Sequence, residues 1–183
     1  MKNFIKIIFL LAIIIVGNNI QVGAYDTYNV FDEMYNSTLI AQRKANFKKS
    51  FSTLNQALMM SEALNDKLYS NFDDVWNKGI LDRLANPKNI PNGVILADLT
   101  YITYSKTGKP CVKAPQNENS ASKKTACAVL TIDTNGNKEP NTYSTNQKIN
   151  DRFAVLLYSD RVLTIPNSVE WKLVNEYKNR RNY

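Results

Sequence analysis

The chain has 183 residues, of which 44% are hydrophobic and 21% are charged, and its formal net charge is +7. This length and composition indicate one globular domain and exclude a disordered, collagen-like or multi-span membrane protein. Because the sequence has no His and only two Cys, most zinc sites and every Ser-His or Cys-His catalytic arrangement are excluded. These exclusions favour a small, non-catalytic domain.

The N-terminal segment has the pattern of a signal peptide. Two lysines precede an apolar run of ten residues, 7–16, whereas a membrane crossing needs about 20 apolar residues. Small or β-branched residues come before the predicted cleavage point between Ala24 and Tyr25. We therefore expect residues 1–24 to be removed and residues 25–183 to form one exported domain. The alternative is an uncut leader that stays as a marginal membrane anchor.

The two cysteines, Cys111 and Cys127, indicate a structural disulfide in an exported protein. An oxidising compartment allows a cysteine pair to persist as a disulfide, and the spacing is not the C-x-x-C of a redox catalyst. Such a bond would restrict the unfolded chain by about 3 kcal/mol in the loop-entropy model. The expected location is therefore extracytoplasmic: periplasmic, cell-surface or secreted.

A long amphipathic helix is predicted from about Asp32 to Asn65. The segment contains no Pro or Gly, and its apolar residues recur every three or four positions. The opposite face carries basic residues that make a candidate surface for an anionic ligand such as DNA, a surface polymer or a lipid head group. A solvated face is the alternative, and nucleic acid is not the expected ligand because no known aromatic-basic motif is present. These basic residues are Arg43, Lys44, Lys48 and Lys49.

Two shorter helices are also predicted. The first runs from Phe72 to Leu84, with Asn71 as its N-cap and a proline soon after its end. The second runs from Val169 to Tyr177, and Asn167 or Ser168 can cap it.

The residues between these helices change to the period of two that is typical of strands. A long loop from Ser105 to Thr125 is plausible in a compact domain only if it is fixed, and the predicted disulfide would fix it. The expected fold is α+β: a long N-terminal amphipathic helix packed on an antiparallel β-sheet, with a short second helix and a C-terminal helix. The predicted strands are 94–104, 126–132, 153–158 and 161–165, the last two forming a hairpin.

The segment from Asp133 to Asn141 carries oxygen-bearing side chains at its first, third and fifth positions. Oxygen ligands suit calcium, so we consider a calcium site here, although Gly136 stands fourth and not sixth as in an EF-hand loop. A polar Asn-Gly turn without an ion is the alternative. The candidate calcium ligands are Asp133, Asn135, Asn137 and Asp151.

Several phrases along the chain carry a resemblance to a known family. They are residues 48–58, 93–103, 133–141 and 151–153, together with the cysteine pair. In this order they resemble the periplasmic part of type IV pilin-like proteins and type II secretion pseudopilins, over roughly residues 34–166. The resemblance implies a long helix on an antiparallel sheet, assembly through the apolar first half of that helix, and in some members a calcium ion in a late loop.

The usual prepilin leader motif of that family is not found before Asp26. The chain therefore resembles a pilin-type globular domain exported through an ordinary secretion signal. The resemblance implies a structural or interaction role, with other pilin-like or secretion-system subunits as partners. The alternatives are a secreted module for an anionic ligand and a hydrolase that uses carboxylates as acid and base. Aspartate is also common in caps and turns, which is the alternative role for these residues. The carboxylates considered for the hydrolase are Asp73, Asp74, Asp98, Asp133, Asp151 and Asp160.

Overall fold

The computed structural model describes residues 24–65, 68–136 and 138–180. The chain divides into two units, residues 1–37 and 38–183. In the first unit the described residues all belong to helix α2 (Ala24–Asn65), which continues into the second unit. The predicted leader lies outside the described residues except for Ala24. Within the described ranges, no helix is both long and apolar enough to cross a membrane.

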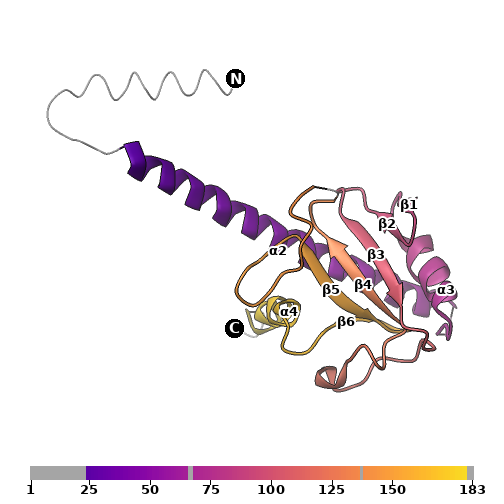
Figure 1. Cartoon of the computed structure of the whole chain (residues 1–183). Helices are drawn as coiled ribbons and strands as arrows, with labels where there is room; N and C mark the ends of the chain where they lie inside the picture. The colour runs from indigo at the N-terminus through magenta and orange to yellow at the C-terminus, as the bar shows by residue number, and fades with distance from the viewer. Residues whose placement is uncertain (1–23, 66–67, 137, 181–183) are drawn as a thin grey trace, which may run out of the picture. The chain divides into compact units, whose positions relative to one another are not determined.

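The second unit contains one antiparallel sheet in which the strands follow the order of the chain (Figure 1). Every neighbouring pair of strands is antiparallel, so each connection is a simple reversal. The predicted antiparallel sheet is confirmed. Its strands are β1 (Lys88–Ile90), β2 (Gly93–Ile95), β3 (Tyr101–Lys106), β4 (Ala128–Asp133), β5 (Arg152–Leu157) and β6 (Val162–Thr164).

Residues 38–65 of α2 pack on one face of this sheet. Phe47, Leu54 and Leu58 are buried at the three- and four-residue spacing that the sequence predicts. The ring of Phe47 stacks on that of Phe153 in β5, with centroids 4.5 Å apart. The long amphipathic helix on an antiparallel sheet is therefore confirmed.

The second helix consists of three short pieces. α3 (Phe72–Asp74) is followed by a π-helical turn, η1 (Val75–Ile80), and a 3₁₀ turn, η2 (Leu81–Arg83). The predicted cap is confirmed, because the side chain of Asn71 accepts a hydrogen bond from the backbone N–H of Asp74 at 2.8 Å. The remaining helix, α4 (Val169–Arg180), begins after Ser168, whose hydroxyl accepts from the N–H of Trp171.

The predicted strand 94–104 is wrong as a single element, because the chain reverses inside it. Leu96 N–H donates to Thr100 O at 2.9 Å, Thr100 N–H donates to the Asp98 carboxylate, and Leu99 takes a positive φ of 65°. This turn separates β2 from β3. Strand β1 was not predicted, because it has only three residues and is exposed except at Ile90.

The sheet buries apolar side chains on both faces. The face toward α2 carries Val155 and Leu157 of β5, and Val169 and Leu173 of α4 complete that core. Leu156 alternates to the other face, where it joins a second cluster beneath the β3–β4 loop. The other buried members of the second cluster are Ala114, Ala121, Ala126, Tyr158 and Leu163. The β3–β4 loop therefore covers apolar side chains on one face of the sheet, as α2 does on the other face.

Candidate functional site

The β4–β5 loop comprises residues 134–151, and the two residues that flank it are paired in the sheet. Asp133 closes β4, Arg152 opens β5, and the two are register partners. The guanidinium Nε of Arg152 donates to Asp133 Oδ2 at 2.9 Å. An ion pair therefore holds the two ends of the loop together.

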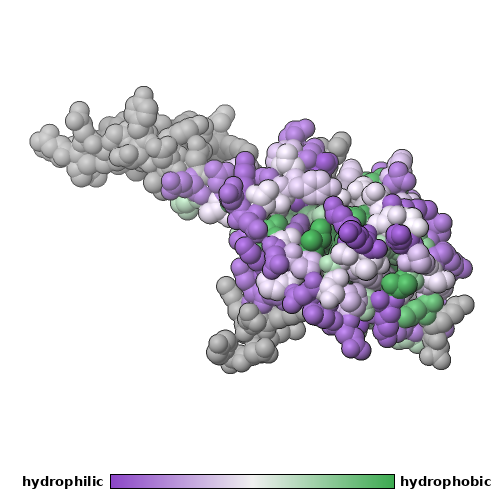
Figure 2. All heavy atoms as spheres, turned by 60° about the horizontal axis from the view of Figure 1, so that its bottom comes forward, coloured by the Kyte–Doolittle hydropathy of each residue, from purple (hydrophilic) through white to green (hydrophobic). Residues whose placement is uncertain are grey.

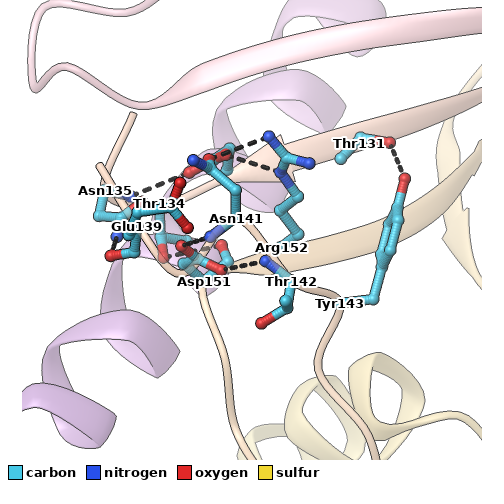
Figure 3. Close-up of polar contacts among 10 residues, drawn as sticks. Thr131, Thr134, Asn135, Glu139, Asn141, Thr142, Tyr143, Asp151 and Arg152 are labelled. Atoms are coloured by element: carbon cyan, nitrogen blue, oxygen red, sulfur yellow. Dashed lines mark hydrogen bonds and ion pairs between the residues drawn. The ribbon is translucent and has the colours of Figure 1, made fainter. Parts of the chain in front are cut away.

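Asp151 is the most enclosed acid of this loop, with no exposed surface. Its two carboxylate oxygens accept hydrogen bonds from the backbone N–H groups of Asn141 at 2.8 Å and Thr142 at 2.9 Å (Figure 3). Its carbonyl oxygen accepts from both the N–H and the hydroxyl of Thr134. Asp151 therefore joins the beginning, middle and end of the loop.

The asparagines of the loop extend this network. Nη2 of Arg152 donates to Asn141 Oδ1 at 2.9 Å, and Nδ2 of Asn135 donates to Glu139 O at 3.2 Å. Gly136 has a φ of +69°, and a Cβ at this position would lie 2.9 Å from Leu99 O. Only glycine fits there, because both the backbone conformation and the close approach of the β2–β3 turn exclude a side chain.

Burial sets the proton affinity of Asp133, which is only 5% exposed. Desolvation raises the pKa of the Asp133 carboxyl, and the negative charge of Asp151 raises it further. The hydrogen bond from Arg152 lowers it, but the net result is a pKa above the ordinary value of 3.8. Arg152 thus only partly offsets the burial of this carboxylate.

Three of the four residues considered for calcium lie in this network, and Asn137 lies outside the described residues. Asp133 and Asp151 both direct their carboxylates at protein donors, and Arg152 supplies the positive charge that a cation would bring. The described part of the chain contains no group of three or more His, Cys, Asp or Glu side chains that could hold a metal ion. The arrangement does not fit a calcium ion without displacement of Arg152, and the calcium site stays a prediction.

The basic residues of α2 differ in their contacts. Arg43 lies on the same helical stripe as buried Phe47, and its Nη1 donates to Ile149 O at 3.4 Å. Lys49 forms a 2.7 Å ion pair with Asp98 in the β2–β3 turn. Lys44 and Lys48, four positions apart, form no ion pair with a described residue. Binding of an anionic ligand by all four stays a prediction.

The aspartates considered for a hydrolase are dispersed over the domain. Asp73 pairs with Lys106 and Asp74 with Lys78. Asp160 is buried and accepts from Ala114 N–H at 2.7 Å and from the guanidinium of the next residue. Asp133 and Asp151 share the loop network described above. In the described structure each of these carboxylates therefore has a partner in a cap, a turn or an ion pair.

The disulfide between Cys111 and Cys127 is confirmed, with the two Cα atoms 4.8 Å apart. Cys127 directly precedes β4 and its N–H donates to Leu157 O, whereas the N–H of Cys111 donates to Ser70 O. The bond therefore fixes the β3–β4 loop both to the sheet and to the segment after α2. Four lysines of this loop, at positions 109, 113, 123 and 124, were not singled out from the sequence, although a local count of charges identifies them.

A groove of about 420 Å³ lies between α2, β6 and α4. Phe51 and Met59 of α2, Leu163 of β6 and Val174 of α4 give it apolar walls, and Glu62 stands among its polar lining residues. Val162 N–H at the edge of β6 donates to Asn55 Oδ1 of α2 at 2.9 Å. Helix α2 therefore closes part of this edge of the sheet.

No family model, no curated protein and no solved structure matches this chain. The fold itself gives the classification. The chain forms a disulfide-bonded α+β domain in which a long helix packs on a six-stranded antiparallel sheet, and this arrangement is consistent with a pilin-like fold. A disulfide of this kind is typical of an oxidising, extracytoplasmic compartment.

Proposed function

We propose that this chain is a non-catalytic, extracytoplasmic, pilin-like or pseudopilin-like protein. Its role is that of a structural or interaction component associated with type IV pilus or type II secretion machinery. The observation that carries the proposal is the packing of α2, through Phe47 and Leu54, on a meander of six antiparallel strands. This is the layout that the resemblance implies for that family.

Two further features support the proposal. A buried disulfide is typical of proteins in an oxidising compartment, in agreement with the signal-like pattern of residues 1–24. The polar residues of the β4–β5 loop are linked to one another by hydrogen bonds, which suits a rigid contact surface better than a reacting centre. Loops held on a rigid scaffold commonly carry binding.

Cell fractionation combined with intact-mass measurement tests the compartment. The exported protein should lack residues 1–24, and its mass should rise by the two thiol hydrogens only after reduction. A Cys111→Ser, Cys127→Ser variant is the matched control, since its mass should not respond to reductant. An uncleaved chain in the cytoplasm with both thiols reactive would overturn the proposed location.

Cross-linking in the producing cell tests the partners. A photo-reactive residue at exposed Tyr143 or Thr142, on the β4–β5 loop, should capture a pilus or secretion-system subunit. The same residue at exposed Asn89 on β1 serves as the control position. Absence of any such subunit from both positions, with normal export, would contradict the proposed association while leaving the location intact.

A further inference from the structure

The β3–β4 loop carries much of the positive charge of the protein. Residues 105–127 are the last two residues of β3 and the whole β3–β4 loop, and they contain five lysines and one acidic residue, Glu118. This segment has a net charge of +4, and the whole chain has a formal net charge of +7. We call residues 105–127 the lysine loop.

The structure brings the two arms of the lysine loop together at the end of the sheet. The disulfide joins the arms, and both contact the β5–β6 turn. On the first arm, Val112 O accepts from Ser159 N–H at 3.0 Å and Ala114 N–H donates to Asp160. On the second arm, the Thr125 hydroxyl lies 2.8 Å from the hydroxyl of Tyr158. Lys113, between Val112 and Ala114, and Lys124, next to Thr125, are thus both held near residues 158–160.

Four of the five lysines are available to a ligand. Lys106 pairs with Asp73 at 2.8 Å, but the other four are exposed and form no ion pair within the described ranges. Lys113 lines the groove between α2, β6 and α4, which also contains Glu62, Glu118 and Asp160. Asp160 is buried and already paired with Arg161. The four available residues are Lys109, Lys113, Lys123 and Lys124.

The loop is also ordered before any ligand arrives. Its disulfide and its hydrogen bonds to residues 158–160 fix the backbone, which lowers the entropy that binding must remove. The four available lysine side chains are exposed on this backbone. Lysines of this kind act as point charges toward phosphates and do not read base edges as the fork of arginine does.

The composition of the loop narrows the choice of polyanion. The lysine loop contains no aromatic residue, whereas proteins that bind single strands stack bases on aromatic side chains. Among the described residues of the loop, Val112 is the one large apolar side chain with substantial exposure. A single exposed valine gives too little apolar area for insertion into a bilayer. Figure 2, in which the lower side of Figure 1 faces the viewer, shows a largely hydrophilic surface with small separate hydrophobic areas.

We propose that the lysine loop binds the phosphate backbone of double-stranded DNA without sequence specificity. This inference goes beyond the proposed structural role, and it does not require assembly with any other subunit. The expected affinity is that of a non-specific electrostatic contact, with a Kd on the order of 10⁻⁴ to 10⁻⁶ M at physiological salt.

The test is fluorescence anisotropy of a labelled duplex titrated with the full exported protein at several salt concentrations. Four neutralised contacts should make log K fall with log salt with a slope of about −3 to −4. A variant with Lys109→Gln, Lys113→Gln, Lys123→Gln and Lys124→Gln should bind at least about tenfold more weakly and lose most of this slope. A variant with arginine at the same four positions should bind at least as well as the wild type.

The control removes the same charge elsewhere, through Lys88→Gln, Lys138→Gln, Lys148→Gln and Lys172→Gln, all at exposed positions. This variant should retain most of the affinity. A third variant, Lys44→Gln with Lys48→Gln, separates the lysine loop from the basic residues of α2. Because the side chains changed in the two fourfold variants are exposed, circular dichroism and thermal melting of these variants should be unchanged. Lys44 and Lys48 are half-buried, so the melting of that variant is measured before its affinity is compared. If the lysine-loop variant melts early, the Lys123→Gln, Lys124→Gln pair replaces it, with a correspondingly smaller loss.

Three outcomes would overturn the proposal. The first is unchanged affinity in the fourfold lysine-loop variant. The second is an equal loss in the charge-matched control or a larger loss in the α2 variant, since either would assign binding to net charge or to the helix. The third is binding to anionic lipid vesicles or heparin without binding to the duplex. Failure of export or of subunit association would affect the proposed function and leave this measurement unchanged.

Discussion

Asp151 illustrates how one buried carboxylate can organise a long loop. A carboxylate oxygen that accepts from a backbone N–H makes a charge-assisted hydrogen bond, and Asp151 makes two, to Asn141 and Thr142. Its main chain also binds Thr134 at the other end of the loop. The ion pair of Asp133 with Arg152 stands beside these contacts but is partly open to solvent on the arginine side. Among these residues Asp151 should therefore contribute most to loop order.

Replacement of Asp151 by Asn should lower the free energy of unfolding by about 2 to 4 kcal/mol, because an amide nitrogen would face a buried N–H donor. Urea unfolding followed by fluorescence measures this change. Asp73→Asn is the matched control, since that side chain is exposed and its ion pair should contribute less than about 1 kcal/mol. Equal stability of the two variants would show that Asp151 does not hold the loop.

Asp98 offers a pH-dependent test at the same scale. Burial raises its pKa, but the hydrogen bonds from Lys49 and Thr100 outweigh burial and hold the pKa below 3.8. A lowered folded-state pKa means that this contribution to stability is present above the unfolded pKa and is lost as pH falls through the folded value.

In a Lys49→Gln variant the pKa of Asp98 should rise toward its unfolded value, so the stability that is lost on acidification should become smaller. NMR titration of the carboxyl carbon measures the pKa directly. Lys48→Gln, one residue away and without an ion pair to any described side chain, should leave the Asp98 signal unchanged. The same titration curve in all three proteins would contradict the assigned pairing.

At the scale of elements, sequence patterns predicted the parts whose signals are local. The apolar spacing of α2, the Asn71 cap and the β5–β6 hairpin each depend on neighbouring residues, and the structure contains all three. Two features were missed for different reasons. The turn that divides β2 from β3 is held by a local hydrogen bond from Thr100 N–H to Asp98, inside a run whose β-branched residues favour a continuous strand. Arg43 donates to a carbonyl more than a hundred residues away, a contact that no local pattern indicates.

The candidate site in the β4–β5 loop could likewise be predicted only in part. The polar segment after β4 was recognisable from its oxygen-rich composition. Composition could not show that Arg152 of β5 would lie opposite Asp133 of the neighbouring strand β4. Nor could it show that Asp151 accepts hydrogen bonds from the backbone. The gathering of the loop lysines depends on the contacts with residues 158–160, which only the folded chain provides.

The pairing of β2 with β3 gives a test at this scale. A Cβ added to Gly93 would lie 2.3 Å from Ile102 O and 2.9 Å from Thr103 Cα, both backbone atoms. Gly93→Ala should therefore lower the free energy of unfolding by about 3 kcal/mol or more. Gly108→Ala is the contrast, because its surroundings are open and only its φ of +75° opposes a side chain, at a cost of about 1 kcal/mol. Comparable melting temperatures for the two variants would refute the close approach.

At the scale of the whole second unit, both edges of the sheet are protected from pairing with another chain. β1 is short and has Pro87 before it and Pro91 after it. β6 lies under α2, where Asn55 accepts from the outward N–H of Val162. Short strands, prolines and covering helices are common ways to prevent association at a sheet edge.

Removal of the Asn55 side chain should expose this edge. Asn55→Ala should cost about 1 to 2 kcal/mol, because the N–H of Val162 loses its acceptor, and should increase aggregation on mild heating. Light scattering during a thermal ramp measures the second effect. Gln56→Ala, at an exposed position of the same helix, should change neither property. Identical scattering by both variants would rule out protection of β6 by Asn55.

The disulfide also limits how far the protein can be stretched. Cys111 and Cys127 are 16 positions apart in sequence but only 4.8 Å apart between Cα atoms. When tension unfolds the oxidised chain, the segment between them contributes almost no length, whereas in the reduced chain it would add roughly 50 Å. The domain should therefore lengthen less under force with its cross-link intact than after reduction.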